Sequence, residues 1–85
     1  MRVRLLYFAS IREQLGCAAE SLELPAGITT VGALLEHLML RGGAWREALA
    51  QTRVLRVAIN QDMAEPGRTL SGGDEVAFFP PVTGG

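Results

Sequence analysis

The first segment of the chain alternates between two faces, as a strand does. This period-2 pattern over residues 2–8 predicts a β-strand that leads directly into a short helix. Ser10 and Glu13 have the spacing of a capping box at the start of that helix, and Gly16 is placed to end it. The two faces of the strand are Val3, Leu5 and Tyr7 on one side and Arg2, Arg4, Leu6 and Phe8 on the other.

A second strand and the main helix follow. The stretch "ESLELP" alternates again, and we expect Leu22 and Leu24 to face inward before the chain turns. Thr29 or Thr30 can cap the main helix, and the two glycines at 42–43 are expected to end it. The apolar stripe of this helix has helical spacing and consists of Val31, Leu34, Leu35, Leu38 and Met39.

The second half of the chain predicts one more helix and further strands. "AWREALAQ" is a brief helical piece with Trp45, Ala48 and Leu49 on one side. Strands are expected in "VLRVAIN", in a hairpin-like stretch around "AEPGRTL", and in "EVAFF", which follows the "SGGD" turn and stops at two prolines. One amphipathic helix covers only one face of a small sheet, so this order predicts a two-layer α+β domain.

The open face of such a sheet should be polar, but apolar residues interrupt it. Phe78 and Phe79 are adjacent and point to opposite faces, so Phe79 lies on the open face if Phe78 faces the helix. Phe8 is on the open side of the first strand, and Met63 is a third candidate for an exposed apolar group. Together these residues indicate a docking surface. The alternative is that edge loops or the segment 44–50 cover them.

Composition fits one small globular domain. Of the 85 residues, 48% are hydrophobic and 20% charged, which argues against disorder. The net charge is −1 and there is no basic cluster, so we expect no nucleic-acid partner. Cys17 is the only cysteine, which suits a reducing compartment, and the start of the chain lacks a signal-peptide pattern. Because no apolar run has membrane-spanning length, we expect a cytoplasmic protein with no membrane partner.

The side chains offer no catalytic constellation. A metal site needs several converging ligands, and one histidine with one cysteine does not make one, so we predict no metal. Gly72-Gly73 lacks the following lysine and helix of a phosphate-binding loop. We expect His37 to be a surface residue and Cys17 a small buried hydrophobe. All eight basic residues are arginine, so no side-chain amine is present.

The remaining chemical group is the carboxylate that follows "FFPPVTGG". Two prolines favour an extended path away from the body, two β-branched residues continue it, and two glycines form a stalk thin enough for a narrow tunnel. A carboxylate is a poor electrophile, so another protein must activate it, most simply as an acyl-adenylate made with ATP. We expect a folded domain over residues 1–81 and a flexible tail over 82–85. The stalk consists of Pro80, Pro81, Val82, Thr83, Gly84 and Gly85.

Three motifs link the chain to a known family: "YFASIRE" near the start, "INQD" in the middle and "GDEVAFFPPVTGG" at the end. In these motifs the chain closely resembles the small subunits of molybdopterin synthase, which are ubiquitin-like sulfur carriers. The resemblance runs from the first residue to the last, although residues 42–53 are not diagnostic. It implies a β-grasp (ubiquitin-like) fold, which agrees with the predicted order of elements.

The resemblance also implies a reaction cycle at Gly85. An adenylating enzyme related to ubiquitin-activating enzymes would activate this residue with ATP, and a sulfur donor protein would leave a thiocarboxylate there. Gly84 would let the tail thread into the large subunit of molybdopterin synthase, which supplies the catalytic side chains. There the sulfur would pass to cyclic pyranopterin monophosphate, and two carriers in turn would build the molybdopterin dithiolene. The resemblance implies a heterotetramer of two small and two large subunits, with no permanently bound cofactor. The implied partner-binding residues are Phe8, Met63, Phe79, Pro80, Pro81, Val82 and Thr83.

Other functions remain open at this point. Sulfur carriers for thiamine or another thiolation pathway also end in Gly-Gly, although "FFPP" before it is not their usual form. A ubiquitin-like protein modifier is a further alternative, and the lack of lysine excludes only chains built on itself. The last is a β-grasp interaction module with an inert tail. Deletion of Gly85 separates a carrier from an inert module, because a carrier loses its function while still folding and an inert module loses nothing.

Overall fold

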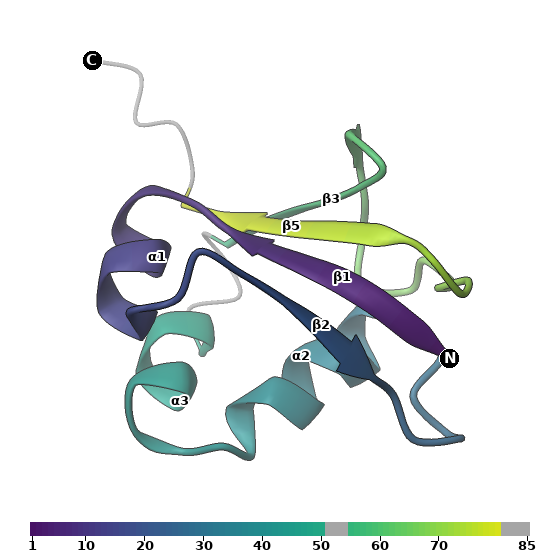
Figure 1. Ribbon diagram of the computed structural model, residues 1–85, viewed down its shortest axis with the longest axis horizontal. Helices are drawn as coiled ribbons and strands as arrows, with labels where there is room; N and C mark the ends of the chain where they lie inside the picture. The colour runs from purple at the N-terminus through teal and green to yellow at the C-terminus, as the bar shows by residue number, and fades with distance from the viewer. Residues whose placement is uncertain (51–54, 81–85) are drawn as a thin grey trace.

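The computed structural model describes residues 1–50 and 55–80, and these form a mixed sheet with three helices on one side of it (Figure 1). The strand order is β2-β1-β5-β3-β4. In chain order the elements are β1 (Arg2–Tyr7), α1 (Ala9–Leu15), β2 (Ala19–Glu23), α2 (Val31–Met39), α3 (Gly43–Leu49), β3 (Arg56–Ile59), β4 (Asp62–Met63) and β5 (Glu75–Phe79).

The two central strands run parallel. β1 pairs with β5 in parallel, whereas the pairs β1–β2, β3–β5 and β3–β4 are antiparallel. Because parallel strands end at the same edge of a sheet, the residues that follow β1 lie beside the end of β5. The segments "YFAS" (7–10) and "FFP" (78–80) therefore meet, although they are far apart along the chain.

The core lies between the sheet and the helices, and it confirms the predicted facing of the strands and of the main helix. Alternate residues of each central strand are buried, and four residues of the predicted α2 stripe join them, while Met39 packs at the margin. The buried cluster includes Val3, Leu5, Tyr7, Val57, Ile59, Val76 and Phe78 from the sheet and Val31, Leu34, Leu35 and Leu38 from α2. The predicted two-layer α+β architecture is confirmed.

The predicted capping box of the first helix is wrong. α1 already begins at Ala9, so Ser10 lies inside it, and no side chain caps its start. The carbonyl of Phe8 accepts from the N–H groups of Ile11 and Arg12 instead, and Ala9 makes the sharp turn with φ 51°. Phe8 occupies the N-cap position, and its side chain has no group that can accept from these N–H groups. Gly16 ends the helix in the left-handed conformation, as predicted.

At the two ends of α2, the start confirms one of the two predicted caps and the end differs from the prediction. Thr30, not Thr29, caps α2, and its hydroxyl accepts from the N–H of Ala33 at 3.2 Å. The two glycines at 42–43 do not end α2 but lie at the start of α3. α2 stops at Met39, and Leu40 is its C-cap residue. Gly42 has φ 75°, a conformation that lets the chain reverse between the two helices.

The predicted hairpin in "AEPGRTL" is wrong, and the hairpin lies earlier. β3 turns into the short strand β4 at Asn60-Gln61, where both φ angles are positive. The later stretch contributes one isolated bridge, between Thr69 and Thr30. Pro66 and Gly67 form a turn in this stretch, but no paired strands extend from that turn as they would in a hairpin. Val54, at the start of the predicted third strand, lies outside the described residues.

Candidate docking face and tail

A row of apolar residues crosses the open face of the sheet from edge to edge. The strand register places Leu6 between Ala19 and Ala77, and Ala58 between Ala77 and Met63. These five residues come from five different strands and lie in line because their register pairs are continuous. Met63, at the edge, is 59% exposed, so this row ends in an accessible apolar side chain.

Two phenylalanines lie next to this row, at the edge where β1 and β5 end. Phe8 is 44% exposed, Phe79 is half-buried, and their rings meet edge to face with centroids 6.5 Å apart. The N–H of Phe8 donates to the carbonyl of Phe78 at 3.0 Å, which extends the β1–β5 pairing by one residue. An exposed edge-to-face pair beside an apolar row is suited to bury surface against another protein.

Charged residues border the apolar face and are of mixed sign. Arg4 lies opposite Glu75 in the parallel pairing, and Arg56 lies opposite Phe79. Arg2 pairs with Glu23 at 3.5 Å at the far end of the sheet. The rim therefore has no single sign that would attract nucleic acid, and it fits the polar border of a protein interface.

The helices leave this face open. α3 packs in the helix layer, where Trp45 meets Tyr7 edge to face with centroids 5.4 Å apart. Leu49 of the same helix is fully buried in the core. The segment 44–50 thus covers the core side of the sheet, and the alternative that it shields Phe8, Met63 and Phe79 is wrong.

The structure places four of the predicted partner-binding residues and leaves the others outside its description. Phe8 and Phe79 touch each other. Met63 lies on the same face of the sheet, in the edge strand β4, and half-buried Pro80 directly follows β5. Sequence reasoning identified Phe8 and Phe79 from the period-2 pattern, Met63 from its place after the "INQD" turn, and Pro80 as the start of the extended tail. The remaining predicted site residues, Pro81, Val82, Thr83, Gly84 and Gly85, lie outside the described residues.

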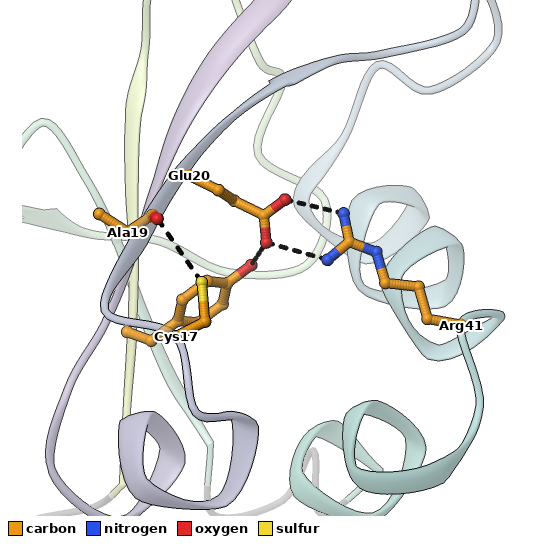
Figure 2. Close-up of polar contacts among 5 residues, drawn as sticks. Cys17, Ala19, Glu20 and Arg41 are labelled. Carbon is orange, nitrogen blue, oxygen red and sulfur yellow. Dashed lines mark hydrogen bonds and ion pairs between the residues drawn. The ribbon is translucent and has the colours of Figure 1, made fainter.

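A polar cluster that sequence reasoning missed lies on the helix side of the sheet (Figure 2). Arg41 donates two hydrogen bonds to the carboxylate of Glu20, at 2.9 and 2.8 Å, and the Tyr7 hydroxyl donates to the same carboxylate at 3.1 Å. The guanidinium also lies 4.3 Å from the centre of the Trp45 ring. These contacts tie strand β2 to the loop between α2 and α3. They lie near the end of β1, since Tyr7 is the last residue of that strand and precedes Phe8.

The cluster shifts the pKa values of its members in directions that favour the ion pair. Hydrogen bonds from Arg41 lower the pKa of Glu20 below its usual value, although burial works against this. Burial raises the pKa of the Tyr7 hydroxyl, and the neighbouring Glu20 carboxylate raises it further. Tyr7 therefore stays a neutral hydrogen-bond donor and Glu20 an acceptor at neutral pH.

The described residues show little other reactive chemistry. No group of three or more His, Cys, Asp or Glu side chains within residues 1–50 and 55–80 is arranged to hold a metal ion. Cys17 is half-buried rather than fully buried, and its thiol donates to the carbonyl of Ala19 at 3.5 Å. His37 is half-buried on α2. Over the same residues, no helix is long and apolar enough to cross a membrane.

The fold defines the class of protein: a ubiquitin-like β-grasp domain, whose sheet carries an apolar row on the side away from the helices. The chain belongs to the ThiS family, whose model matches residues 5–85. This match includes both terminal glycines.

Individual relatives support the same assignment. The "Molybdopterin synthase sulfur carrier subunit" of Escherichia coli (strain K12) is 41% identical over 83 residues, which cover 98% of this chain and 99% of the relative. The crystal structure of SAMP1 from Haloferax volcanii is similar over 100% of both chains, with a TM-score of 0.75 and 29% identity. A chain in the complex of subunits 1 and 2 of molybdopterin-converting factor from Helicobacter pylori 26695 has a TM-score of 0.69 at 22% identity, again over 100% of both chains, and shows the fold alone. The predicted β-grasp fold and family resemblance are confirmed.

Proposed function

We propose that this chain is the sulfur carrier subunit of molybdopterin synthase and carries sulfur as a thiocarboxylate on Gly85. The observation that carries this proposal is the 41% identity, over nearly the full length of both chains, to a relative that bears this name. The family match to residue 85 includes the tail on which the chemistry depends. The open apolar face fits the same function, because a carrier must dock before its tail can react.

The chemistry needs two steps on the tail and one at the acceptor. The Gly85 carboxylate attacks the α-phosphate of ATP and displaces pyrophosphate, which leaves an acyl-adenylate. A sulfide-equivalent nucleophile from a sulfur donor protein then displaces AMP and forms the thiocarboxylate. In the large subunit, the sulfur bonds to a carbon of cyclic pyranopterin monophosphate and displaces an oxygen substituent from it. Water then cleaves the bond between the sulfur and the tail carbonyl carbon and restores the Gly85 carboxylate. Two such transfers supply the two sulfurs of the dithiolene.

The folded domain would dock on the partner, direct the tail into the partner's active site, and offer no side-chain amine to the activated tail. Phe8, Met63 and Phe79 would contact the large subunit and the adenylating enzyme, and residues 80–83 would lead Gly84 and Gly85 into the partner's active site. Because the sequence has no lysine, the activated tail meets no side-chain amine on a copy of its own chain. We place the cycle in the cytoplasm, where ATP is supplied and a free cysteine such as Cys17 stays reduced.

Mass spectrometry of the intact chain tests the proposal. After incubation with the adenylating enzyme, ATP and a sulfide source, fragmentation should locate one oxygen-to-sulfur exchange at Gly85. Localisation is essential, because oxidation of Met63 or Cys17 changes the nominal mass by the same amount. A chain lacking Gly85 is the matched control and should stay unmodified while remaining folded. An unmodified Gly85 beside a demonstrably active adenylating enzyme would refute the carrier function.

A second candidate function is protein modification. It is favoured by the full-length similarity to SAMP1 of Haloferax volcanii, a small archaeal modifier protein by name. A modifier would form an amide between Gly85 and a lysine of another protein, whereas a carrier would release sulfur to a small molecule. Adding the large subunit and cyclic pyranopterin monophosphate to the thiocarboxylate form separates the two. Dithiolene formation supports the carrier, and its absence together with lysine conjugates would support the modifier; transfer to a thiazole precursor instead would indicate the thiamine pathway.

A further inference from the structure

Asn60 holds the β3–β4 hairpin in a conformation that costs energy. It is the first residue of the two-residue turn and has φ 50°, and Gln61 follows with φ 73°. Two positive φ angles are typical of a type I′ turn, which favours asparagine first and glycine second. With glutamine in the second position, the turn is strained, so contacts outside it must hold it in place.

The side chain of Asn60 completes a strand pairing that the backbone leaves open. The backbone N–H of Asn60 donates to the carbonyl of Glu75 at 2.8 Å, as in a regular antiparallel pair. The return bond differs, because the N–H of Glu75 donates to the side-chain Oδ1 of Asn60 at 3.0 Å. A left-handed residue leaves the strand path, and its side-chain oxygen takes the place of the backbone carbonyl. β3 thus stays paired with β5 up to the point where the hairpin turns.

The other half of the same amide fixes a second turn. Nδ2 of Asn60 donates to Oδ1 of Asp74 at 3.0 Å, and Oδ2 of Asp74 accepts from the N–H of Ser71 at 2.8 Å. Glycine at position 60 would keep the backbone conformation but lose both side-chain bonds. Aspartate would keep the acceptor but lose the donor and place a second carboxylate beside Asp74. Asparagine alone combines the left-handed backbone, the acceptor and the donor.

β4 depends on this support because it is very short. It has two residues, and its register consists of the pairs Ile59–Asp62 and Ala58–Met63. Met63 is 59% exposed, so the core does not hold its side chain in place. Its position on the open face follows from the direction in which the hairpin leaves β3 and from one further bond to β3, in which the N–H of Ala64 donates to the carbonyl of Val57 at 2.9 Å.

We propose that Asn60 is a positioning residue of the docking surface: through Asp74 and Glu75 it fixes β4 and so presents Met63 to the large subunit. This inference rests on the proposed function, since the large subunit is the partner that Met63 would contact. Asn60 itself would not touch the partner's active site or the tail. Its effect on binding should therefore pass through Met63.

A double-mutant cycle on partner binding tests this role. Calorimetric affinities for the purified large subunit would be compared among the wild type, Asn60→Gly, Met63→Ala and the double variant. Asn60→Gly should weaken binding about three- to tenfold, because the partner must then order the hairpin. In the Met63→Ala background the same change should alter affinity less than about twofold. Thr30→Ala, which loses a helix cap in the other layer, is the control for lowered stability and should bind like the wild type.

Two results would overturn the positioning role: wild-type affinity in Asn60→Gly, or an undiminished effect of Asn60→Gly when Met63 is already alanine. If the wild type itself failed to bind the large subunit, the proposed function would be contradicted, and hydrogen exchange of the free chain would decide the inference by itself. Amides 61–64 should exchange faster in Asn60→Gly than in Thr30→Ala. Equal exchange in the two variants would refute the role of Asn60.

Discussion

The ring of Tyr7 stacks on the ring of Phe78 in the core, with centroids 5.6 Å apart and planes 15° from parallel. The two residues are direct partners in the parallel pairing of β1 and β5. The next residue of each strand, Phe8 and Phe79, therefore emerges on the opposite face beside the other. The same strand pairing thus brings together the buried aromatic pair and, on the opposite face, the pair that we assign to docking.

Phe79→Ala should impair docking much more than folding. Phe79 is half-buried and contacts Phe8 on the open face, so its loss should weaken binding to the large subunit about tenfold or more. The free energy of unfolding should fall by only about 1 kcal/mol. Calorimetric titration and urea unfolding measure the two quantities. Leu40→Ala is the control, since Leu40 is 82% exposed at the end of α2, and an equal loss of binding there would contradict the assignment.

Phe78→Leu should lower the free energy of unfolding more than the same substitution at Phe79. Phe78 is fully buried against Tyr7, so the smaller side chain leaves space in the core and loses the stacking contact. We expect a loss of about 1 to 2 kcal/mol in the free energy of unfolding. Phe79→Leu, one residue further on, should cost less than about 0.5 kcal/mol because it keeps an apolar group on an exposed face. Equal costs at the two positions in urea unfolding would mean that they do not point to opposite faces.

Glu20→Gln should lower stability at neutral pH but not in acid. Arg41 holds the pKa of Glu20 below its ordinary value of 4.5, so the folded state binds fewer protons than the unfolded state. The resulting stabilisation is present above pH 4.5 and is lost as the pH falls through the lowered pKa. The bidentate geometry suggests a cost of about 1 kcal/mol for the variant at neutral pH.

The Glu20 prediction is checked by urea unfolding of both proteins across the acid range. The curves of the wild type and Glu20→Gln should converge as the pH falls from 4.5 through the lowered pKa of Glu20. Glu13→Gln serves as the control, because Glu13 is exposed on α1 and the described residues give it no ion pair. A Glu20→Gln deficit that stayed constant with pH would point to lost packing rather than lost charge.

Thr30→Ala should destabilise the domain, whereas Thr29→Ala should not. The Thr30 hydroxyl accepts from the N–H of Ala33 at the start of α2, and its loss should cost about 1 kcal/mol. Thr29 is exposed and makes no such bond in the described structure, so its replacement should change the free energy of unfolding by less than about 0.5 kcal/mol. Thermal or urea unfolding of the pair decides it, and the opposite ranking would place the helix start one residue earlier.

Local signals predicted much of the architecture and part of the site. The apolar stripe of α2 and the alternation in β1 and β5 were sufficient to say which side chains face the core, including the opposite directions of Phe78 and Phe79. Gly16 was recognised because a left-handed helix end is a local property of one residue. The capping box at Ser10 failed because the preceding strand fixes where the helix begins, and no local pattern shows that constraint.

Spacing over a few positions was enough to predict which residues of an element face the core, and the proposed chemistry of the tail rests on such local spacing as well. Tertiary structure decided which elements meet. Glu20 and Arg41 are 21 residues apart and pair only because β2 lies beside the loop after α2. Asn60 reaches Asp74, and Phe8 reaches Phe79, only through the order and register of β3, β5 and β1. Such contacts depend on the order and register of all the strands in the sheet. No short stretch of sequence specifies that register.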